Sequence, residues 1–210
     1  MKNSIINKIE NLKVLPVIAI ENASDAVNLG KTLVDNFLPA AEITYRTCAA
    51  TKTIESLKDN FPEMLVCAGT AITKQNVLDA TQAGADFVIT PGFNPKLVDF
   101  CLSQDIDIIP GINNPSQIEI ALDFNLKYLK FFPAEASGGI KMLNSLLGPY
   151  KDIKIMPTGG ITPSNLKDYL SIKGVIGCGG TWIAPSKTIS ENDWPTIAKN
   201  VKNLNDLLNK

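Results

Sequence analysis

Histidine is absent from the 210 residues, and arginine occurs once, as Arg46. The lack of histidine excludes Ser-His-Asp and Cys-His catalysis, imidazole-ligated metals and histidine proton relays. Acid–base chemistry would then rely on Glu, Asp, Lys, Tyr or Cys. Every other basic residue is a lysine, so Arg46 is expected where a planar, bidentate group is required. The alternative is that one surface arginine has persisted by chance.

Charge excess, long apolar runs and clustered cysteines are also lacking. The net charge is −1 at pH 7, which disfavours binding to nucleic acid or to a membrane surface. No apolar run reaches the ~18 residues of a transmembrane helix, and the N-terminus shows no secretory signal. The four cysteines contain no C-x-x-C and fit reduced, mostly buried thiols rather than a disulfide framework or zinc site. We therefore expect a cytoplasmic protein without a bound metal.

Short apolar runs alternate with helical patterns along the whole chain. Eight runs are typical of buried strands and begin near Leu15, Ala41, Met64, Asp86, Ile106, Lys127, Ile153 and Gly174. Apolar residues recur at helical spacing between them, and residues 2–12 predict an additional leading helix. Proline at the first helical position loses no hydrogen bond, so three later helices are predicted to start at Asn94-Pro95, Asn114-Pro115 and Thr162-Pro163.

This alternation predicts an α/β protein with one domain over residues 1–210, a (β/α)8 TIM barrel with an extra N-terminal helix. No long linker or low-complexity segment interrupts the pattern. A doubly wound open sheet is the alternative, but no G-x-G-x-x-G follows the first predicted strand. Because barrel enzymes place their active sites at the C-terminal ends of the strands, polar residues at those ends are the candidates.

The second predicted strand carries charged residues within an apolar run. Because side chains alternate along a strand, Glu42, Thr44 and Arg46 are expected on one face, pointing into the barrel. Burying a carboxylate and a guanidinium is costly unless the groups are paired or used. The two interpretations are a structural Glu42–Arg46 ion pair at the rim, or an acid–base group beside a group that binds a carboxylate.

Lys130 lies in the aromatic run 128–132 of the sixth predicted strand. If it faced outward, its ammonium group could extend to solvent between helices. If it faces inward, it is desolvated, and desolvation favours the neutral amine. A neutral amine is the nucleophile that forms a Schiff base with a carbonyl substrate. Beside Glu42 and Arg46, Lys130 would complete a set of nucleophile, acid–base group and carboxylate clamp.

Glycine pairs end the seventh and eighth predicted strands, in Thr158-Gly159-Gly160 and Gly179-Gly180-Thr181. Glycine lets backbone N–H groups approach an anion, and barrels often bind phosphate in these two loops. The helix expected from Thr162 would point its N-terminus at the same place. Simple tight turns are the alternative. Thr70, which follows the third predicted strand, adds a hydroxyl donor toward the same mouth.

These stretches make the chain similar to the 2-keto-3-deoxy-6-phosphogluconate (KDPG) aldolase family, also called KHG/KDPG aldolases, over essentially its whole length. The most specific are Lys130-Phe-Phe-Pro-Ala-Glu135 and Pro157-Thr-Gly-Gly160. Further matches are Glu42-Ile-Thr-Tyr-Arg46-Thr47, Ala68-Gly-Thr70, Thr90-Pro-Gly92, Ile109-Pro-Gly111 and Gly179-Gly-Thr-Trp182. The family consists of class I aldolases on a (β/α)8 barrel and is usually trimeric. The resemblance thus implies a homotrimer that needs no metal or cofactor.

The resemblance also implies a role for each candidate residue. Lys130 would form the Schiff base, and Glu42 would be the general acid/base. Arg46 and Thr70 would hold the carboxylate of pyruvate. The other substrate-binding positions would be Pro91 and Phe132 in the pocket wall, Thr158 near the sugar hydroxyls, and Gly159, Gly160, Gly180 and Thr181 around the phosphate.

The implied reaction splits a phosphorylated keto acid, KDPG, into pyruvate and glyceraldehyde 3-phosphate; activity on the shorter 4-hydroxy-2-oxoglutarate is left open. One rival is another phosphate-binding barrel enzyme, such as an epimerase or decarboxylase, but those usually use a metal with His or Asp ligands. The other is a catalytically silent barrel that binds a phosphorylated acid for regulation. Such a protein would keep Arg46 and the glycines but would not need Lys130 with Glu42.

Overall fold

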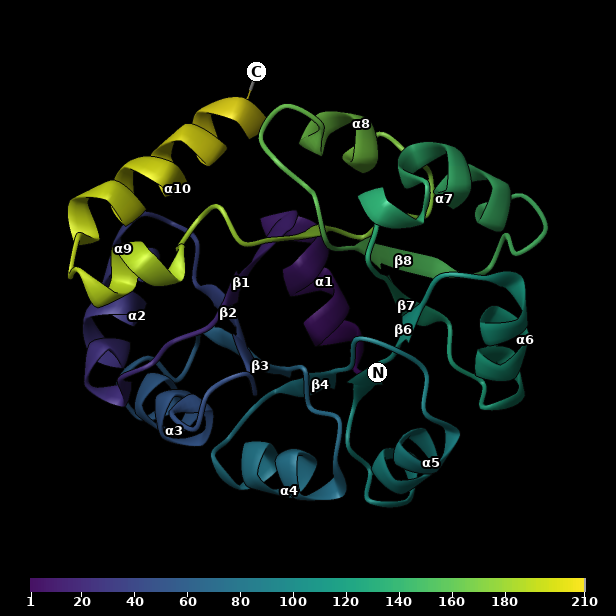
Figure 1. Cartoon of the computed structure of the whole chain (residues 1–210), viewed down its shortest axis with the longest axis horizontal. Helices are drawn as coiled ribbons and strands as arrows, with labels where there is room; N and C mark the ends of the chain where they lie inside the picture. Colours follow the sequence, from purple (N-terminus) through teal and green to yellow (C-terminus); the bar gives the residue numbers. More distant parts are fainter. Residues whose placement is uncertain (210) are drawn as a thin grey trace. The chain divides into compact units, whose positions relative to one another are not determined.

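The chain divides into two compact units in the computed structural model, which describes residues 1–209. The first unit comprises Met1–Val14 and Ile89–Gly180, and the second comprises Leu15–Val88 and the residues from Thr181 on. Helices and strands alternate along both (Figure 1). The predicted α/β class is therefore confirmed.

The second unit is built on neighbouring strands in the order β4-β3-β2-β1. These strands are β1 (Val14–Ile18), β2 (Ala40–Thr44), β3 (Leu65–Gly69) and β4 (Phe87–Ile89), of which β1 and β4 cross the boundary between the units by one residue. The pairs β1–β2 and β2–β3 are parallel, and Glu42 lies opposite Cys67 in the second pair. The helices are η1 (Ala23–Asp25), α2 (Ala26–Asp35), α3 (Ala50–Asn60), α4 (Lys74–Gln82), α9 (Ser186–Ser190) and α10 (Trp194–Leu208).

Helices α2 and α3 lie side by side in this unit (Figure 1). Their apolar positions recur at helical spacing and are fully buried, as Leu29 and Leu33 in α2 and Leu57 in α3 show. Gly30 allows the close approach, because a Cβ atom there would lie 2.7 Å from Leu57 Cδ2. The two packed helices thus form part of the layer outside the strands, one of which carries Glu42.

The first unit contains three parallel strands in the order β6-β7-β8. Lys130 of β7 lies opposite Gly111 of β6 and Met156 of β8. The strands are β5 (Ile108–Ile109), β6 (Gly111–Ile112), β7 (Tyr128–Phe131), β8 (Lys154–Pro157) and β9 (Cys178–Gly180). The helices are α1 (Asn3–Leu12), α5 (Pro95–Ser103), α6 (Pro115–Asp123), η2 (Glu135–Ser137), α7 (Gly139–Leu147) and α8 (Leu166–Leu170).

The predicted leading helix is confirmed as α1, and it packs at the start of β9. Its buried face carries Ile5, Ile6 and Ile9. A Cβ atom on Gly177 would lie 3.1 Å from Ile9 Cγ2, and the Cys178 N–H donates to the Lys13 carbonyl at 2.8 Å. The helix thereby attaches to the strand that ends in the second glycine pair.

Two of the three predicted Asn/Thr-Pro helix starts are confirmed. The side-chain oxygens of Asn94 and Asn114 accept backbone N–H groups at the starts of α5 and α6, both at 3.1 Å. The third prediction is wrong, because α8 begins at Leu166 rather than at Pro163. Asn165 Oδ1 accepts the Thr162 N–H at 2.8 Å and closes a turn that delays the helix. The five-residue α8 therefore does not supply the anion-binding helix start expected at Thr162.

The fifth predicted strand, expected from Ile106, is divided into β5 and β6. Pro110 separates the two parts, because proline has no N–H group to donate to a neighbouring strand. Its carbonyl still accepts the Lys130 N–H at 2.9 Å. The interruption therefore does not remove the hydrogen bond that anchors β7 at Lys130, the candidate nucleophile.

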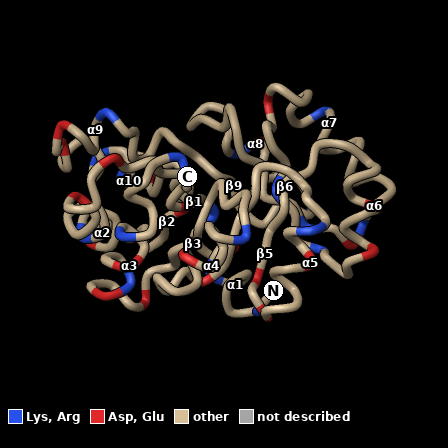
Figure 2. Tube along the Cα trace, turned by 60° about the horizontal axis from the view of Figure 1, so that its bottom comes forward, with Lys and Arg blue, Asp and Glu red and all other residues tan. Residues whose placement is uncertain are grey.

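The charged side chains of both signs are mixed, and most of the cysteines are buried thiols, as expected. Lysine and acidic residues are interspersed along the helices in Figure 2. Cys67, Cys101 and Cys178 are buried free thiols, and Cys48 is an exposed one. Within residues 1–209, no helix is both long enough and apolar enough to cross a bilayer.

Candidate active site

Lys130 is a buried amine on the central strand of the first unit's three-stranded sheet. Only 4% of the residue is exposed, so its ammonium group does not extend to solvent between helices. The Nζ atom lies 5.3 Å from the centroid of the Phe132 ring, within the range of a cation–π contact. Backbone pairing with Gly111 and Met156 on either side holds the strand in place. A primary amine in such a position can act as a carbonyl nucleophile.

Pro91 is brought close to this strand by a glycine. Gly111, the register partner of Lys130, packs directly against the carbonyl group of Pro91, and a Cβ atom there would also lie 2.7 Å from Gly92 N. Gly111 permits this contact because it has no side chain. Pro91 and Phe132 are half-buried, as expected for residues of a pocket wall.

The two glycine pairs meet within the first unit. Thr158 forms an isolated parallel bridge with Gly179, and Gly180 follows at the end of β9. Gly159 and Gly160 have φ values of +99° and +81°, which favour glycine. The segment after β7 holds this loop in place, because the Ala134 N–H donates to the Thr158 carbonyl at 2.8 Å. The two glycine pairs therefore lie close together.

Polar groups in this loop are available to a ligand. Thr158 is 4% exposed, and its hydroxyl oxygen is buried without a hydrogen-bond partner among residues 1–209. The N–H groups of Gly160 and Ile161 likewise donate to no acceptor in that part of the chain. Buried polar groups normally have partners. The loop can thus offer a hydroxyl and two amide donors to an oxygen-rich anion.

Glu42 lies against the end of the neighbouring strand in the second unit. Glu42 is fully buried on β2, and its side chain lies over Gly69, where a Cβ atom would be 2.6 Å from Glu42 Cγ. Thr70 follows Gly69 directly and has φ +56°, an uncommon conformation for a β-branched residue. The Tyr45 N–H donates to the Gly69 carbonyl at 2.8 Å and joins the two strand ends. The Glu42 carboxylate therefore lies at the end of β3, next to the residue that precedes Thr70.

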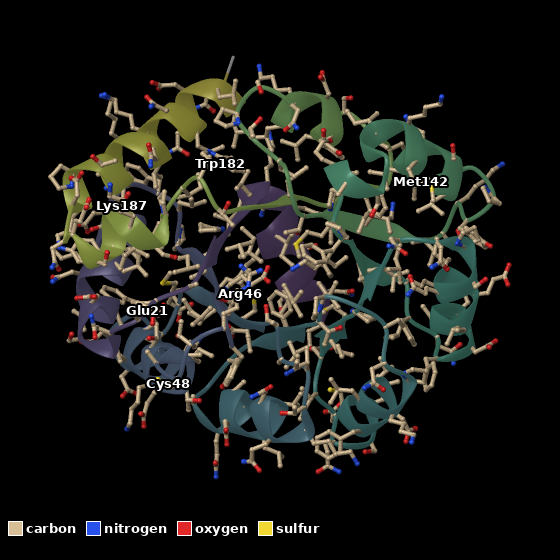
Figure 3. All side chains as sticks on the ribbon, viewed as in Figure 1. Glu21, Arg46, Cys48, Met142, Trp182 and Lys187 are labelled. Atoms are coloured by element: carbon tan, nitrogen blue, oxygen red, sulfur yellow. The ribbon has the colours of Figure 1, made fainter. Side chains whose placement is uncertain are left out.

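Arg46 lies in the turn after β2, which ends at Thr44, so the expected strand is shorter than predicted. The residue is exposed, and within residues 1–209 it forms no ion pair or hydrogen bond. Figure 3 shows Arg46 on the side of its unit's strands that faces away from α2 and α3. The structural Glu42–Arg46 ion pair is therefore not formed. The guanidinium remains available for a ligand's carboxylate.

Two of the three buried thiols are poor alternatives to the lysine as a nucleophile. Burial raises the pKa of the Cys178 thiol to about 12 and that of the Cys101 thiol to about 11. Both stay protonated at neutral pH, whereas the thiolate is the reactive form. Among residues 1–209, no group of three or more acidic or cysteine side chains could hold a metal ion. Thr181, exposed at the start of the last segment of the second unit, is the remaining predicted position.

Comparison with known proteins identifies the family of this chain. A family model described as KDPG and KHG aldolase matches residues 5–200. The chain belongs to this aldolase family. It is 48% identical to a 2-dehydro-3-deoxy-phosphogluconate aldolase of Haemophilus influenzae, over 97% of this chain and 96% of the relative. It is 39% identical to the KHG/KDPG aldolase of Escherichia coli K12, over 89% and 87% of the two chains.

A solved member of the aldolase family has nearly the same fold. The KDPG aldolase of Legionella pneumophila, solved with pyruvate captured as a covalent carbinolamine intermediate, has a TM-score of 0.91 and 35% identity. The match covers 96% of this chain and 98% of that one. A carbinolamine is the first adduct of an amine with a ketone, which is the chemistry that a buried lysine provides.

Proposed function

We propose that this chain is a class I aldolase that cleaves KDPG to pyruvate and glyceraldehyde 3-phosphate through a Schiff base on Lys130. The observation that carries the proposal is a buried lysine amine, 4% exposed, in a chain of the KDPG and KHG aldolase family. The relative with a captured pyruvate carbinolamine supports the same chemistry. A metal-dependent epimerase or decarboxylase would need a cluster of metal ligands, and the described residues contain no group of three or more that could hold a metal ion.

The proposal includes one (β/α)8 barrel domain with an N-terminal helix. Parallel strands in both units and the alternation of strands and helices support it. The fold match to the Legionella enzyme over 96% of the chain supports it as well. We also propose a homotrimer, from the family resemblance, and a cytoplasmic location, from the free thiols.

Carbon–carbon cleavage would proceed by electron withdrawal into a cationic imine. The Lys130 amine adds to the C2 ketone, and loss of water from the carbinolamine gives an iminium. Glu42 takes the proton of the C4 hydroxyl while the C3–C4 bond breaks, and the electron pair moves into the iminium to form an enamine. Glyceraldehyde 3-phosphate leaves. Protonation of the enamine at C3 and hydrolysis then release pyruvate and the free amine.

The other candidate residues would bind and orient the substrate. Arg46 presents a bidentate fork for the C1 carboxylate, with the Thr70 hydroxyl as a second donor. The buried Thr158 hydroxyl would reach a sugar hydroxyl. The phosphate would lie against the backbone of Gly159, Gly160 and Gly180 with the hydroxyl of Thr181, while Pro91 and Phe132 form the apolar wall.

The deciding experiment is reductive trapping with pyruvate and borohydride. Reduction fixes the imine, so one reduced pyruvate should be added to the peptide that contains Lys130, as peptide mapping by mass spectrometry would show. Lys154, which begins the neighbouring strand β8, provides the internal control and should stay unlabelled. A Lys130→Met variant should take up no label. Labelling of another lysine would contradict the assignment, and no labelling at all would favour a regulatory, non-catalytic protein.

A further inference from the structure

A buried tyrosine and an exposed glutamate lie behind the glycine loop of the first unit. Tyr169 of α8 has no exposed surface, and its hydroxyl donates to Glu135 Oε1. Burial is the main cause that raises the Tyr169 pKa, and the hydrogen bond to Glu135 adds to it. The Glu135 N–H donates to the Gly159 carbonyl at 3.0 Å. Glu135 therefore connects the tyrosine to the loop proposed to bind phosphate.

The aliphatic part of the Glu135 side chain packs against the glycine loop, whereas its carboxylate lies farther away. A Cβ atom on Gly160 would lie 2.6 Å from both Cβ and Cγ of Glu135, and the next nearest atom is Glu135 Cα at 3.8 Å. The carboxylate is therefore farther than this from the same point. It lies instead beside Gly139, where a Cβ atom would be 3.0 Å from Glu135 Oε1 and 3.3 Å from the Tyr169 hydroxyl.

This arrangement matters because the loop can bind an anion. The N–H groups of Gly160 and Ile161 have no acceptor within residues 1–209, so they are open to any nearby carboxylate as well as to a phosphate. The Glu135 carboxyl carbon is bonded to the Cγ atom that packs on Gly160. Rotation about that side chain would bring a negative charge to the donors that a phosphate needs, where like charges repel.

We propose that Tyr169 is a positioning residue that holds the Glu135 carboxylate away from the glycine loop and so keeps the loop open for the substrate phosphate. The inference rests on the proposed function, since it requires a phosphorylated substrate in this loop. Tyr169 has no exposed surface, so it would not contact the phosphate itself. It acts through Glu135, and it selects for the phosphorylated substrate by removing an internal competitor.

The test compares Tyr169→Phe, Glu135→Gln and the double variant in KDPG cleavage. Tyr169→Phe keeps the ring packing and removes only the hydroxyl. We expect its KM for KDPG to rise about tenfold, equivalent to ~1.4 kcal/mol, with kcat near that of the wild type. Half-saturation by pyruvate in borohydride trapping should not change, because pyruvate has no phosphate. The double variant should regain a KM close to that of Glu135→Gln, because a neutral amide does not repel phosphate.

A second tyrosine–glutamate pair in the same unit provides the matched control. The Tyr150 hydroxyl donates to Glu119 Oε1 at 2.8 Å on the surface, so Tyr150→Phe should leave KM for KDPG unchanged. An unchanged KM in folded Tyr169→Phe would overturn the inference. So would a double variant as impaired as Tyr169→Phe, which would indicate lost packing rather than a released charge. If the wild type fails to cleave KDPG in the same assay, the proposed function fails as well.

Discussion

The two proposed reacting groups and three of the proposed binding residues are held in opposite ways. Lys130 in the first unit and Glu42 in the second lie on strands and are 4% and 0% exposed. Arg46, Thr70 and Gly160 lie in segments after strands and are exposed or half-buried. Strands hold a reactive atom in a fixed position. Loops leave a recognition group within reach of the substrate.

The largest effect should come from the buried carboxylate. Glu42→Gln keeps the shape but removes the proton acceptor, so we expect kcat to fall by roughly 10²–10⁴-fold. Adduct formation with pyruvate should persist, because Lys130 is intact. Steady-state kinetics and trapping on one preparation would separate the two steps. Near-wild-type turnover would contradict an acid–base role for Glu42.

The exposed arginine should affect binding instead. Arg46→Lys retains the charge but loses the fork that matches a carboxylate. We expect pyruvate binding to weaken by ~1.5–3 kcal/mol, the range for hydrogen bonds to charged groups. Half-saturation of borohydride trapping by pyruvate measures this. If pyruvate affinity stays the same, Arg46 is a surface residue without a role in binding.

The glycine loop should be sensitive where another exposed glycine is not. Gly160→Ala places a methyl group against Glu135 at a φ of +81°, a conformation that costs ~1–3 kcal/mol for non-glycine residues. We expect a lower melting temperature and a higher KM for KDPG. Gly92 is the control, because a Cβ atom there meets no atom within 4 Å. Equal behaviour of the two alanine variants would show that the loop tolerates a side chain.

The smallest effect should come from a helix start remote from the proposed chemistry. Asn114→Ala removes the side-chain acceptor for the Gln117 N–H at the start of α6. The free energy of unfolding should fall by about 1 kcal/mol. Chemical denaturation would measure it, and kcat and KM should not change. A larger loss of activity than of stability would tie α6 to the site.

Patterns in the sequence predict the α/β class, the leading helix and two capped helix starts, because these depend on neighbouring residues. The meeting of the glycine pairs and the position of Glu42 over Gly69 follow from strand ends lying together. Two features depend on contacts between residues far apart in the sequence: Gly111 admits Pro91, and Tyr169 binds Glu135. The late start of α8 depends instead on a local turn closed by Asn165, which competes with the start expected at Thr162. The position of Glu135 in the run that begins at Lys130 is the available signal for its contact with Tyr169.

The absence of a side chain at position 69 makes the evolution of this position depend on that of Glu42. Any side chain at position 69 would occupy the volume of the buried carboxylate, since even a Cβ atom would lie 2.9 Å from Glu42 Cδ. A lineage that replaced this glycine would have to give up the carboxylate's position in the same step. The two positions are therefore expected to vary together or not at all, and the glycine limits how this chain can evolve a different acid–base group.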